Sequence, residues 1–184
     1  MASRAIAVRL SATLLAVCAS ACDPGTHGDD GPGDLPPGAE IDLLEAMAIA
    51  IADTPGSVVL DAELTEEPDG LIYDIDRYLD GETREIVIDP GSGKFLDDGF
   101  DPEDQPEGPE QAAALAGSAT MVTLPGAVET AEARYDGKAV SVELDLEGNA
   151  IEVVLFRSDE RPVVVIDLDD GSVRGVQDAP DEDD

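Results

Sequence analysis

The chain has 184 residues, and 43 acidic against 10 basic side chains leave a net charge of -33 at pH 7. This charge repels the phosphates of nucleic acids and of anionic lipid head groups, so nucleic acid is excluded as a partner. The surface would attract basic proteins or cations, although a high negative charge also serves solubility alone.

The first 21 residues have the layout of an export signal peptide. Arg4 and Arg9 accompany an apolar run from Leu10 to Val17, and residues 1–21 contain no acidic side chain. The run is too short for a transmembrane helix, which needs about 20 apolar residues. We expect residues 1–21 to be removed on export to the periplasm or the outer cell envelope.

Cys22 directly follows the small residues Ala19, Ser20 and Ala21. This stretch resembles a bacterial lipobox, in which the cysteine is lipidated and becomes the N-terminus, although Ala19 stands where Leu is usual. After cleavage Cys22 would be the sole thiol and could form no internal disulfide. We predict lipidation at Cys22 and attachment to a membrane. The alternative is cleavage after Ala21 and release as a soluble secreted protein.

Composition divides the remaining chain into five parts. Residues 22–39 are rich in Gly, Pro and Asp and predict a flexible tether, because such a segment cannot bury a core. Two regions with regular apolar spacing follow, at 40–98 and 109–177. An acidic, proline-rich linker at 99–108 separates them, and residues 178–184 predict an acidic disordered tail.

The first region begins with a predicted helix. Asp42 and Glu45 suit its start, and Asp53-Thr54-Pro55-Gly56 ends it. Helical spacing predicts an apolar stripe of Ile41, Leu44, Ala48 and Ile51.

Strands follow the helix. Alternating apolar and acidic residues predict strands over 58–64, 71–75 and 86–88. The turns expected at 67–70 and 80–81 are short, so the strands should be antiparallel neighbours.

The second region shows a similar plan. A helix is predicted from Pro109, with a stripe formed by Ala112, Leu115, Ala116, Ala119 and Val122. Four strand-and-turn segments follow at 127–137, 138–149, 150–160 and 161–175, one strand more than in the first region.

Short internal matches support a repeat. DTPGSVV corresponds to TLPGAVE after each predicted helix, and EIVIDPGSGKFL corresponds to VVVIDLDDGSVRG at the end of each region. One region alone buries a modest core, so the sheets or helices of the two should pack together. The predicted fold is therefore α+β, with two tandem modules that each place one helix on a small antiparallel sheet.

The order of helix, Pro-Gly, strand, hairpin and a closing Val-x-Ile-Asp-x-x-Ser-Gly-Lys-Phe-Leu strand resembles the PepSY domain. The resemblance covers 40–98 and, more loosely, 109–177, with Ser92 where Thr is usual. It implies two PepSY-like modules without catalytic residues. PepSY modules occur in propeptides of secreted metallopeptidases and in exported bacterial proteins. The resemblance thus implies a binding or regulatory role, such as inhibition of an exported peptidase.

Catalytic and cofactor sites are not expected. A phosphate loop would need Gly at the position of Ile88 and Ser or Thr at that of Phe95, so the Gly-Ser-Gly before Lys94 predicts a turn. His27, the only histidine, lies in the tether, where nothing could hold it as a base. One His and one remaining Cys cannot supply a zinc site.

Two acidic groups and a set of outward-facing apolar residues are further candidates for a binding site. Two acidic groups could supply oxygen ligands but lack the EF-hand spacing, so calcium binding belongs only to an alternative function, that of an acidic envelope lipoprotein or assembly factor. These groups are Asp97, Asp98, Asp101, Glu103 and Asp104, and Asp167, Asp169 and Asp170. The alternation also turns Ile72, Tyr78, Val87, Val154 and Phe156 away from the predicted core.

Overall fold

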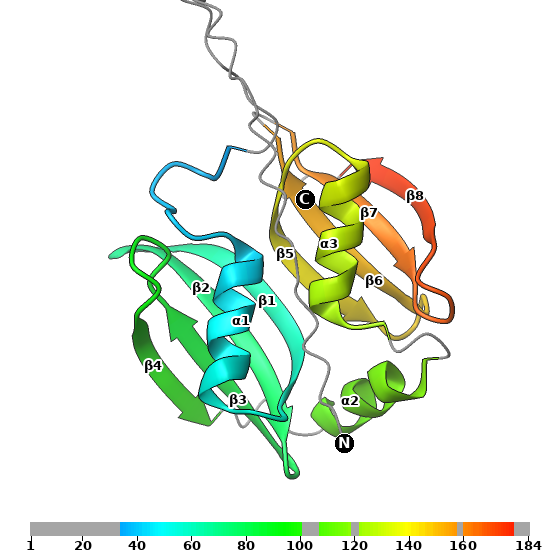
Figure 1. The fold of residues 1–184 in the computed structure, drawn as a ribbon, viewed down its shortest axis with the longest axis horizontal. Coiled ribbons are helices and arrows are strands. Elements are labelled where there is room, and N and C mark those ends of the chain that lie inside the picture. The colour runs from blue at the N-terminus through cyan, green and yellow to red at the C-terminus, as the bar shows by residue number, and fades with distance from the viewer. Residues whose placement is uncertain (1–33, 101–106, 119–121, 158–159, 179–184) are drawn as a thin grey trace, which may run out of the picture.

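The computed structural model describes residues 34–100, 107–118, 122–157 and 160–178. Within these residues the chain forms three helices and eight strands (Figure 1). In chain order they are α1 (Leu43–Asp53), β1 (Val58–Glu67), β2 (Gly70–Leu79), β3 (Glu82–Ile88), β4 (Phe95–Phe100), α2 (Gly108–Gly117), α3 (Leu124–Arg134), β5 (Lys138–Asp145), β6 (Ala150–Phe156), β7 (Pro162–Asp167) and β8 (Val173–Asp178).

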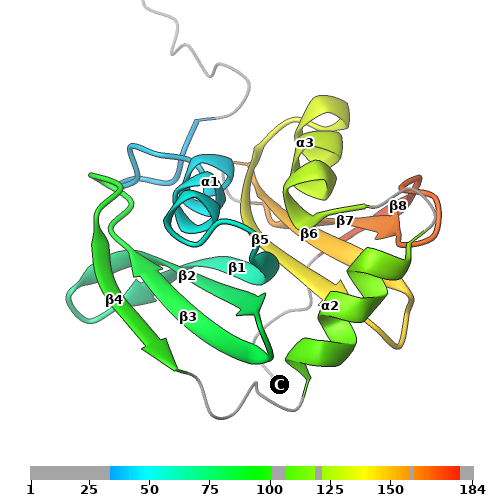
Figure 2. The same ribbon diagram turned by 60° about the horizontal axis from the view of Figure 1, so that its bottom comes forward.

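All eight strands belong to one antiparallel sheet in the order β4-β3-β2-β1-β5-β6-β7-β8. Helices α1 and α3 lie side by side on one face of this sheet (Figure 2). Helix α1 contacts β1, β2 and β5, and α3 contacts β5, β6 and β1, so both helices reach across the junction of β1 and β5. This mixture of helices with an antiparallel sheet agrees with the predicted α+β class.

Helix α1 begins and ends where the sequence predicts. The Asp42 carboxylate accepts from the Glu45 amide at 2.9 Å, and Glu45 accepts from the Asp42 amide, which completes a capping box. The predicted apolar stripe is wrong, however, because Ala48 is exposed and Ile41, Leu44 and Ile51 are only partly buried. The core face consists of Leu43, Ala46, Met47 and Ala50.

Helix α3 occupies most of the segment 127–137, for which a strand was predicted. That prediction is wrong because the Thr123 hydroxyl caps the helix, accepting from the Gly126 amide at 3.2 Å, and Pro125 suits its first turn. Burial of Ala127, Val128 and Ala131 at helical spacing then holds the segment on the sheet.

The similar stretches DTPGSVV and TLPGAVE do not occupy equivalent positions in the structure. Thr54-Pro55-Gly56 follows the end of α1, whereas Thr123-Leu124-Pro125-Gly126 starts α3. Assigning 127–137 to a strand produced the extra strand expected in the second region. In the described residues four strands follow α1 and four follow α3.

Helix α2 is the helix predicted from Pro109, and its Pro109 lies in the first turn. Ala112 and Leu115 are buried as expected, but Ala116 is exposed, and Ala119 lies outside the described residues. The helix contacts β1 and β2 and lies apart from α1 and α3 (Figure 2).

The two halves of the sheet join along β1 and β5. Ala62 pairs with Val142, and this pair is flanked by Asp61 with Glu143 and by Glu63 with Ser141. The buried apolar residues of both halves form one cluster, so the two regions pack together as expected, with their strands joined edge to edge in one sheet. Pairing removes two strand edges that would otherwise expose unpaired amide and carbonyl groups.

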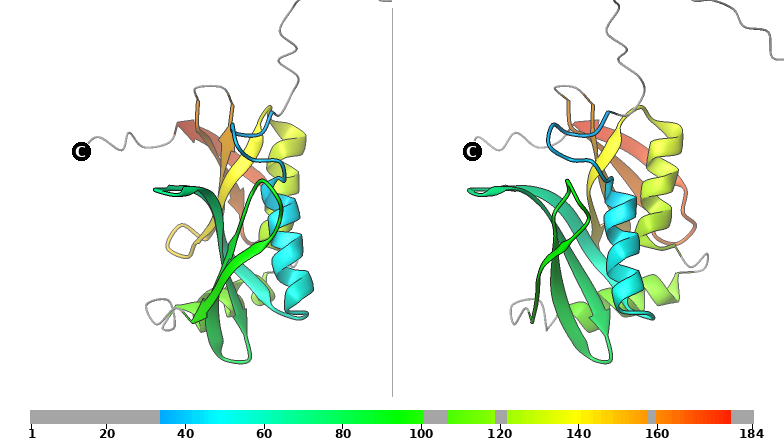
Figure 3. Two further views of the ribbon diagram at one scale, coloured as in Figure 1. Left: turned by 90° about the vertical axis from the view of Figure 1, so that its left-hand side faces the viewer. Right: turned by 60° about the vertical axis from the view of Figure 1, so that its left-hand side comes forward.

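The outer strands β4 and β8 lie at opposite ends of the sheet (Figure 3). Each follows its neighbour through a tight hairpin, β3 to β4 and β7 to β8. Strand β4 runs to Phe100, two residues into the linker expected at 99–108, and β8 reaches Asp178, the first residue of the expected tail.

Candidate binding surface

The Asp89–Lys94 turn has its amides directed into the turn itself. The Gly93 amide donates to the Asp89 carbonyl at 2.8 Å, and the Asp89 amide donates to the Lys94 carbonyl at 2.9 Å. The Ser92 hydroxyl donates to the Asp89 carboxylate at 2.8 Å. These groups close a hairpin and do not form a phosphate cradle, which confirms the predicted turn.

This turn is docked against the start of α1. The Pro90 carbonyl accepts from the amides of Glu40 and Ile41, at 2.9 and 3.0 Å. Gly93 has a φ of +68°, and a Cβ there would lie 3.1 Å from the Ile49 Cδ1 atom. Glycine is therefore required by both backbone conformation and close packing.

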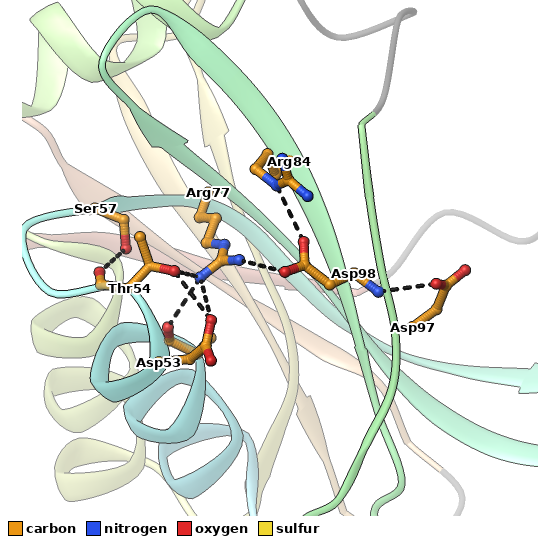
Figure 4. A network of polar contacts seen from close by, with 8 residues as sticks. Asp53, Thr54, Ser57, Arg77, Arg84, Asp97 and Asp98 are labelled. Carbon is orange, nitrogen blue, oxygen red and sulfur yellow. Dashed lines mark hydrogen bonds and ion pairs between the residues drawn. The ribbon is translucent and has the colours of Figure 1, made fainter.

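The carboxylate of Asp98 on β4 forms ion pairs with two arginines, as Figure 4 shows. Its Oδ2 lies 3.1 Å from the Arg77 Nη2 on β2, and its Oδ1 lies 3.1 Å from the Arg84 Nε on β3. The neighbouring Asp97 accepts from the Asp98 backbone amide at 2.9 Å. The two aspartates thus have different partners, and both carboxylate oxygens of Asp98 are paired with arginine.

Arg77 is the charged residue at the centre of this network, and only 3% of it is exposed. Its Nη1 donates to the Ala50 carbonyl at 3.5 Å, to Asp53 Oδ2 at 3.0 Å and to the Thr54 hydroxyl. The hydrogen bond from Arg77 lowers the pKa of Asp53, with further help from Thr54. Arg77 therefore ties the C-terminus of α1 to the edge strand β4.

The second acidic group, at Asp167, is also used internally. Asp167 accepts from the amides of Asp169 and Asp170, at 2.8 and 3.3 Å, and from the Arg174 Nε at 2.8 Å. The bond from Arg174 is the main reason why the pKa of Asp167 is lowered. Within the described ranges, no three His, Cys, Asp or Glu side chains are arranged to hold a metal ion.

The sheet face opposite α1 and α3 carries a row of carboxylates. Five successive strands present them at paired positions in the order Glu85, Asp76, Asp61, Glu143 and Glu152. Neighbouring strands lie about 4.8 Å apart, so the row concentrates like charge. Partial burial, followed by the charges of Glu143 and Asp145, raises the pKa of Glu152.

The apolar residues predicted to point away from the core are half-buried rather than exposed. This holds for Ile72, Tyr78, Val87, Val154 and Phe156. Gly108 of α2 packs against Tyr78, and the Arg161 guanidinium lies 4.7 Å from the centre of the Phe156 ring. These side chains therefore form no exposed apolar patch.

Sequence reasoning missed the apolar residues that are exposed. Among the described residues, the large hydrophobic side chains with substantial exposure are Phe95 at 43%, Leu96 at 56% and Val176 at 44%. All three lie on the edge strands β4 and β8. The signal that could have found them was Phe95-Leu96 after a tight turn, since a turn there returns the chain as a new strand.

Several predicted site residues lie outside the described residues. These are Cys22 and His27, and Asp101, Glu103 and Asp104 of the first acidic group. Among the residues that the structure describes, no helix is long and apolar enough to cross a membrane.

Comparison with known proteins gives one family match. The PepSY model, described as "Peptidase propeptide and YPEB domain", matches residues 40–98, which is less than half of the chain. No curated protein matches the sequence. Among solved structures, the chain is similar to one from Clostridium difficile 630 that is provisionally classed as a lipoprotein, with 16% identity and a TM-score of 0.42. That similarity covers 76% of this chain and 93% of the other.

Proposed function

We propose that this chain is an exported, lipid-anchored binding protein without catalytic activity, which modulates a peptidase outside the cytoplasm. The observation that carries the proposal is the PepSY match over 40–98, a family model whose description names peptidase propeptides. The matched range contains α1, β1 to β3 and β4 as far as Asp98, and so includes the Arg77 network and most of the exposed edge strand.

The charge of the chain is consistent with a protein partner. A net charge of -33 repels nucleic acids and anionic lipid surfaces and attracts basic protein surfaces at long range. A partner with a basic contact surface would therefore be favoured.

The second half of the sheet, in this proposal, is a second PepSY-like module. Three parallels between the halves support it. The face of α3 that is buried, with Leu124, Ala127, Val128 and Ala131, has the same spacing as that of α1. Register irregularities fall between Val59 and Asp61 in β1 and between Ala139 and Ser141 in β5.

The third parallel lies in the closing hairpins. The Asp167 amide donates to the Ser172 carbonyl at 2.8 Å, and the Gly171 amide donates to the Asp167 carbonyl at 2.9 Å. These bonds repeat those of Asp89 and Gly93, and Gly171 has a φ of +71°. The second module would then run from α3 to β8, with α2 as an addition between the modules.

Export and anchoring in the cell envelope rest on the sequence of residues 1–39. The signal-like segment 1–21, Cys22 and the tether at 22–39 support attachment of the folded body to a membrane surface in this proposal. A protein in that position meets peptidases while they are exported or folding.

The proposal is tested by retention of peptidase activity. The mature chain, with Cys22→Ser to prevent lipidation, is immobilised and exposed to the exported protein fraction of its source organism, and eluted proteins are assayed by casein zymography. We expect a retained band of peptidase activity. If the column retains no more activity than one carrying an unrelated protein of equal negative charge, the peptidase role is wrong.

A further inference from the structure

Strand β4 is an open edge of the sheet. Within the described residues it pairs with β3 alone and stands at one end of the strand order. One row of its amide and carbonyl groups therefore faces away from the sheet, where an added strand could pair with it. The other end of the sheet, β8, has the same property and serves as an internal comparison.

The start of β4 presents an apolar anchor beside this edge. Leu96 is the additional residue of a register shift, because Val87 pairs with Asp97 whereas Ile88 pairs with Phe95. Both Phe95 and Leu96 are exposed, at 43% and 56%. Adjacent large apolar side chains on an edge strand are unusual, because they favour association with another chain.

The charges along β4 determine what kind of chain could bind there. Asp98 is occupied by Arg77 and Arg84. Asp97 is exposed, lies on the other face of the strand and accepts a hydrogen bond from the Asp98 amide. A partner strand would therefore meet an apolar pair followed by a carboxylate available to a cation.

A second copy of this chain does not fit that description. Each copy carries a net charge of -33, and pairing two β4 strands would bring two Asp97 side chains to one edge. An extended segment with apolar and basic side chains in alternation has the complementary chemistry.

We propose that β4 binds an extended, basic and apolar segment of a partner protein, which adds a strand at residues 97–100 and packs an apolar side chain on Phe95 and Leu96. Identifying that partner as the modulated peptidase rests on the proposed function, whereas strand addition at β4 does not. Because Asp98 joins β4 to Arg77, an added strand would also be held to the C-terminal end of α1.

The test uses the full mature chain with Cys22→Ser and a synthetic nonapeptide that alternates lysine with valine. Two control peptides carry glutamate in place of lysine, or N-methyl groups on alternate amides to prevent strand pairing. Binding is measured by titration calorimetry and located by amide chemical shifts. We expect the lysine peptide to bind with shifts confined to β4 and its neighbours, and the controls to bind at least about tenfold more weakly.

Matched variants separate the two edges of the sheet. Leu96→Lys should weaken peptide binding about tenfold, and Val176→Lys on β8 should leave it unchanged, because both residues are exposed and neither variant disturbs the core. Asp97→Asn should weaken it about threefold at low salt, since one exposed ion pair is lost. Thermal unfolding confirms that each variant remains folded.

Several results would overturn the assignment. They are equal binding of the glutamate or N-methylated peptide, absence of binding by the lysine peptide, loss of binding in Val176→Lys but not in Leu96→Lys, or a dimer in sedimentation analysis that Leu96→Lys dissociates. The proposed function is distinguished by assaying peptidase modulation with the same variants. Modulation that Leu96→Lys does not change contradicts the identification of the β4 partner as the peptidase, and peptide binding at β4 without modulation contradicts the peptidase role alone.

Discussion

Arg77 and Asp98 form an ion pair of 3.1 Å between two strands that are not neighbours in the sheet. Strand β3 lies between them, so the arginine reaches across it on the face covered by α1. At its other nitrogen the same guanidinium holds Asp53 and the Ala50 carbonyl. One buried side chain thus connects a helix end, a central strand and an edge strand.

Removal of this side chain should destabilise the protein strongly. Arg77→Ala removes the bonds from the guanidinium to Asp53, Asp98 and the Ala50 carbonyl and leaves a gap where the apolar stem lay, and should lower the free energy of unfolding by about 2 kcal/mol. The control is Arg84→Ala, which removes a half-exposed partner of Asp98 and should change that energy by about 0.5 kcal/mol or less. Urea unfolding measures both. Equal losses for the two variants would contradict the central role of Arg77.

Glu152 should destabilise the protein at neutral pH. Its raised folded-state pKa means that the folded chain binds this proton more tightly than the unfolded chain, so the stability cost of its charge is present at pH 7. The cost disappears as the pH falls through the raised pKa and below the ordinary value of 4.5. Glu152→Gln should therefore raise the free energy of unfolding at pH 7 by about 0.5 kcal/mol, and should give no gain at pH 4.

The control for this pH dependence is Glu129→Gln, which removes an exposed carboxylate on α3. Because the whole chain is acidic, this variant reports the general effect of removing one negative charge. Urea unfolding at both pH values compares the two variants. A gain in Glu129→Gln equal to that in Glu152→Gln would show that the carboxylate row has no specific effect.

Gly93 and Gly91 should respond differently to substitution although they stand two residues apart. Gly93→Ala forces a positive φ on a residue with a side chain and brings it against Ile49, so it should cost about 1–2 kcal/mol of stability. Gly91→Ala meets only ordinary contacts and should have little effect. Thermal unfolding distinguishes them. A Gly93→Ala variant as stable as the unsubstituted protein would contradict the turn conformation described for residues 89–94. The conclusion that this turn is no phosphate cradle depends on that conformation.

Cys22 should carry lipid in the mature protein. Mass spectrometry of the processed N-terminus is expected to show an acylated Cys22, and Cys22→Ala should move the protein from the detergent phase to the aqueous phase on Triton X-114 partition. A mature protein that begins with an unmodified Cys22 would refute the anchor and leave the soluble secreted form.

The first region was more predictable from its sequence than the second. Strict alternation in β2 and two short turns allowed the burial of Tyr73 and Ile75 and the turn at Asp80-Gly81 to be predicted, since each depends on neighbouring residues. In 127–137 the local pattern was ambiguous. Its small residues suit a helix only because Ala127 and Ala131 allow α3 to approach the sheet closely, and that contact is made with distant strands.

The candidate surface depends on contacts over still longer distances. The pairing of Ala62 with Val142 and the bond between Arg77 and Asp98 are properties of the assembled sheet. The spacing of apolar residues along the sequence does not predict them. The exposure of Leu96 likewise results from the position of β4 at one edge of the sheet. The sequence predicted the closing turn of this hairpin but not the strand that leaves it.

The most direct test of the central claim is a kinetic titration of the exported peptidase that binds to the immobilised mature chain in the retention experiment. The peptidase is purified, and its rate on a peptide substrate is measured as increasing amounts of the chain are added. A binding partner that modulates the peptidase should change the rate saturably, with one chain bound per enzyme at the end point. A rate that stays constant while the chain is in large excess would contradict the account.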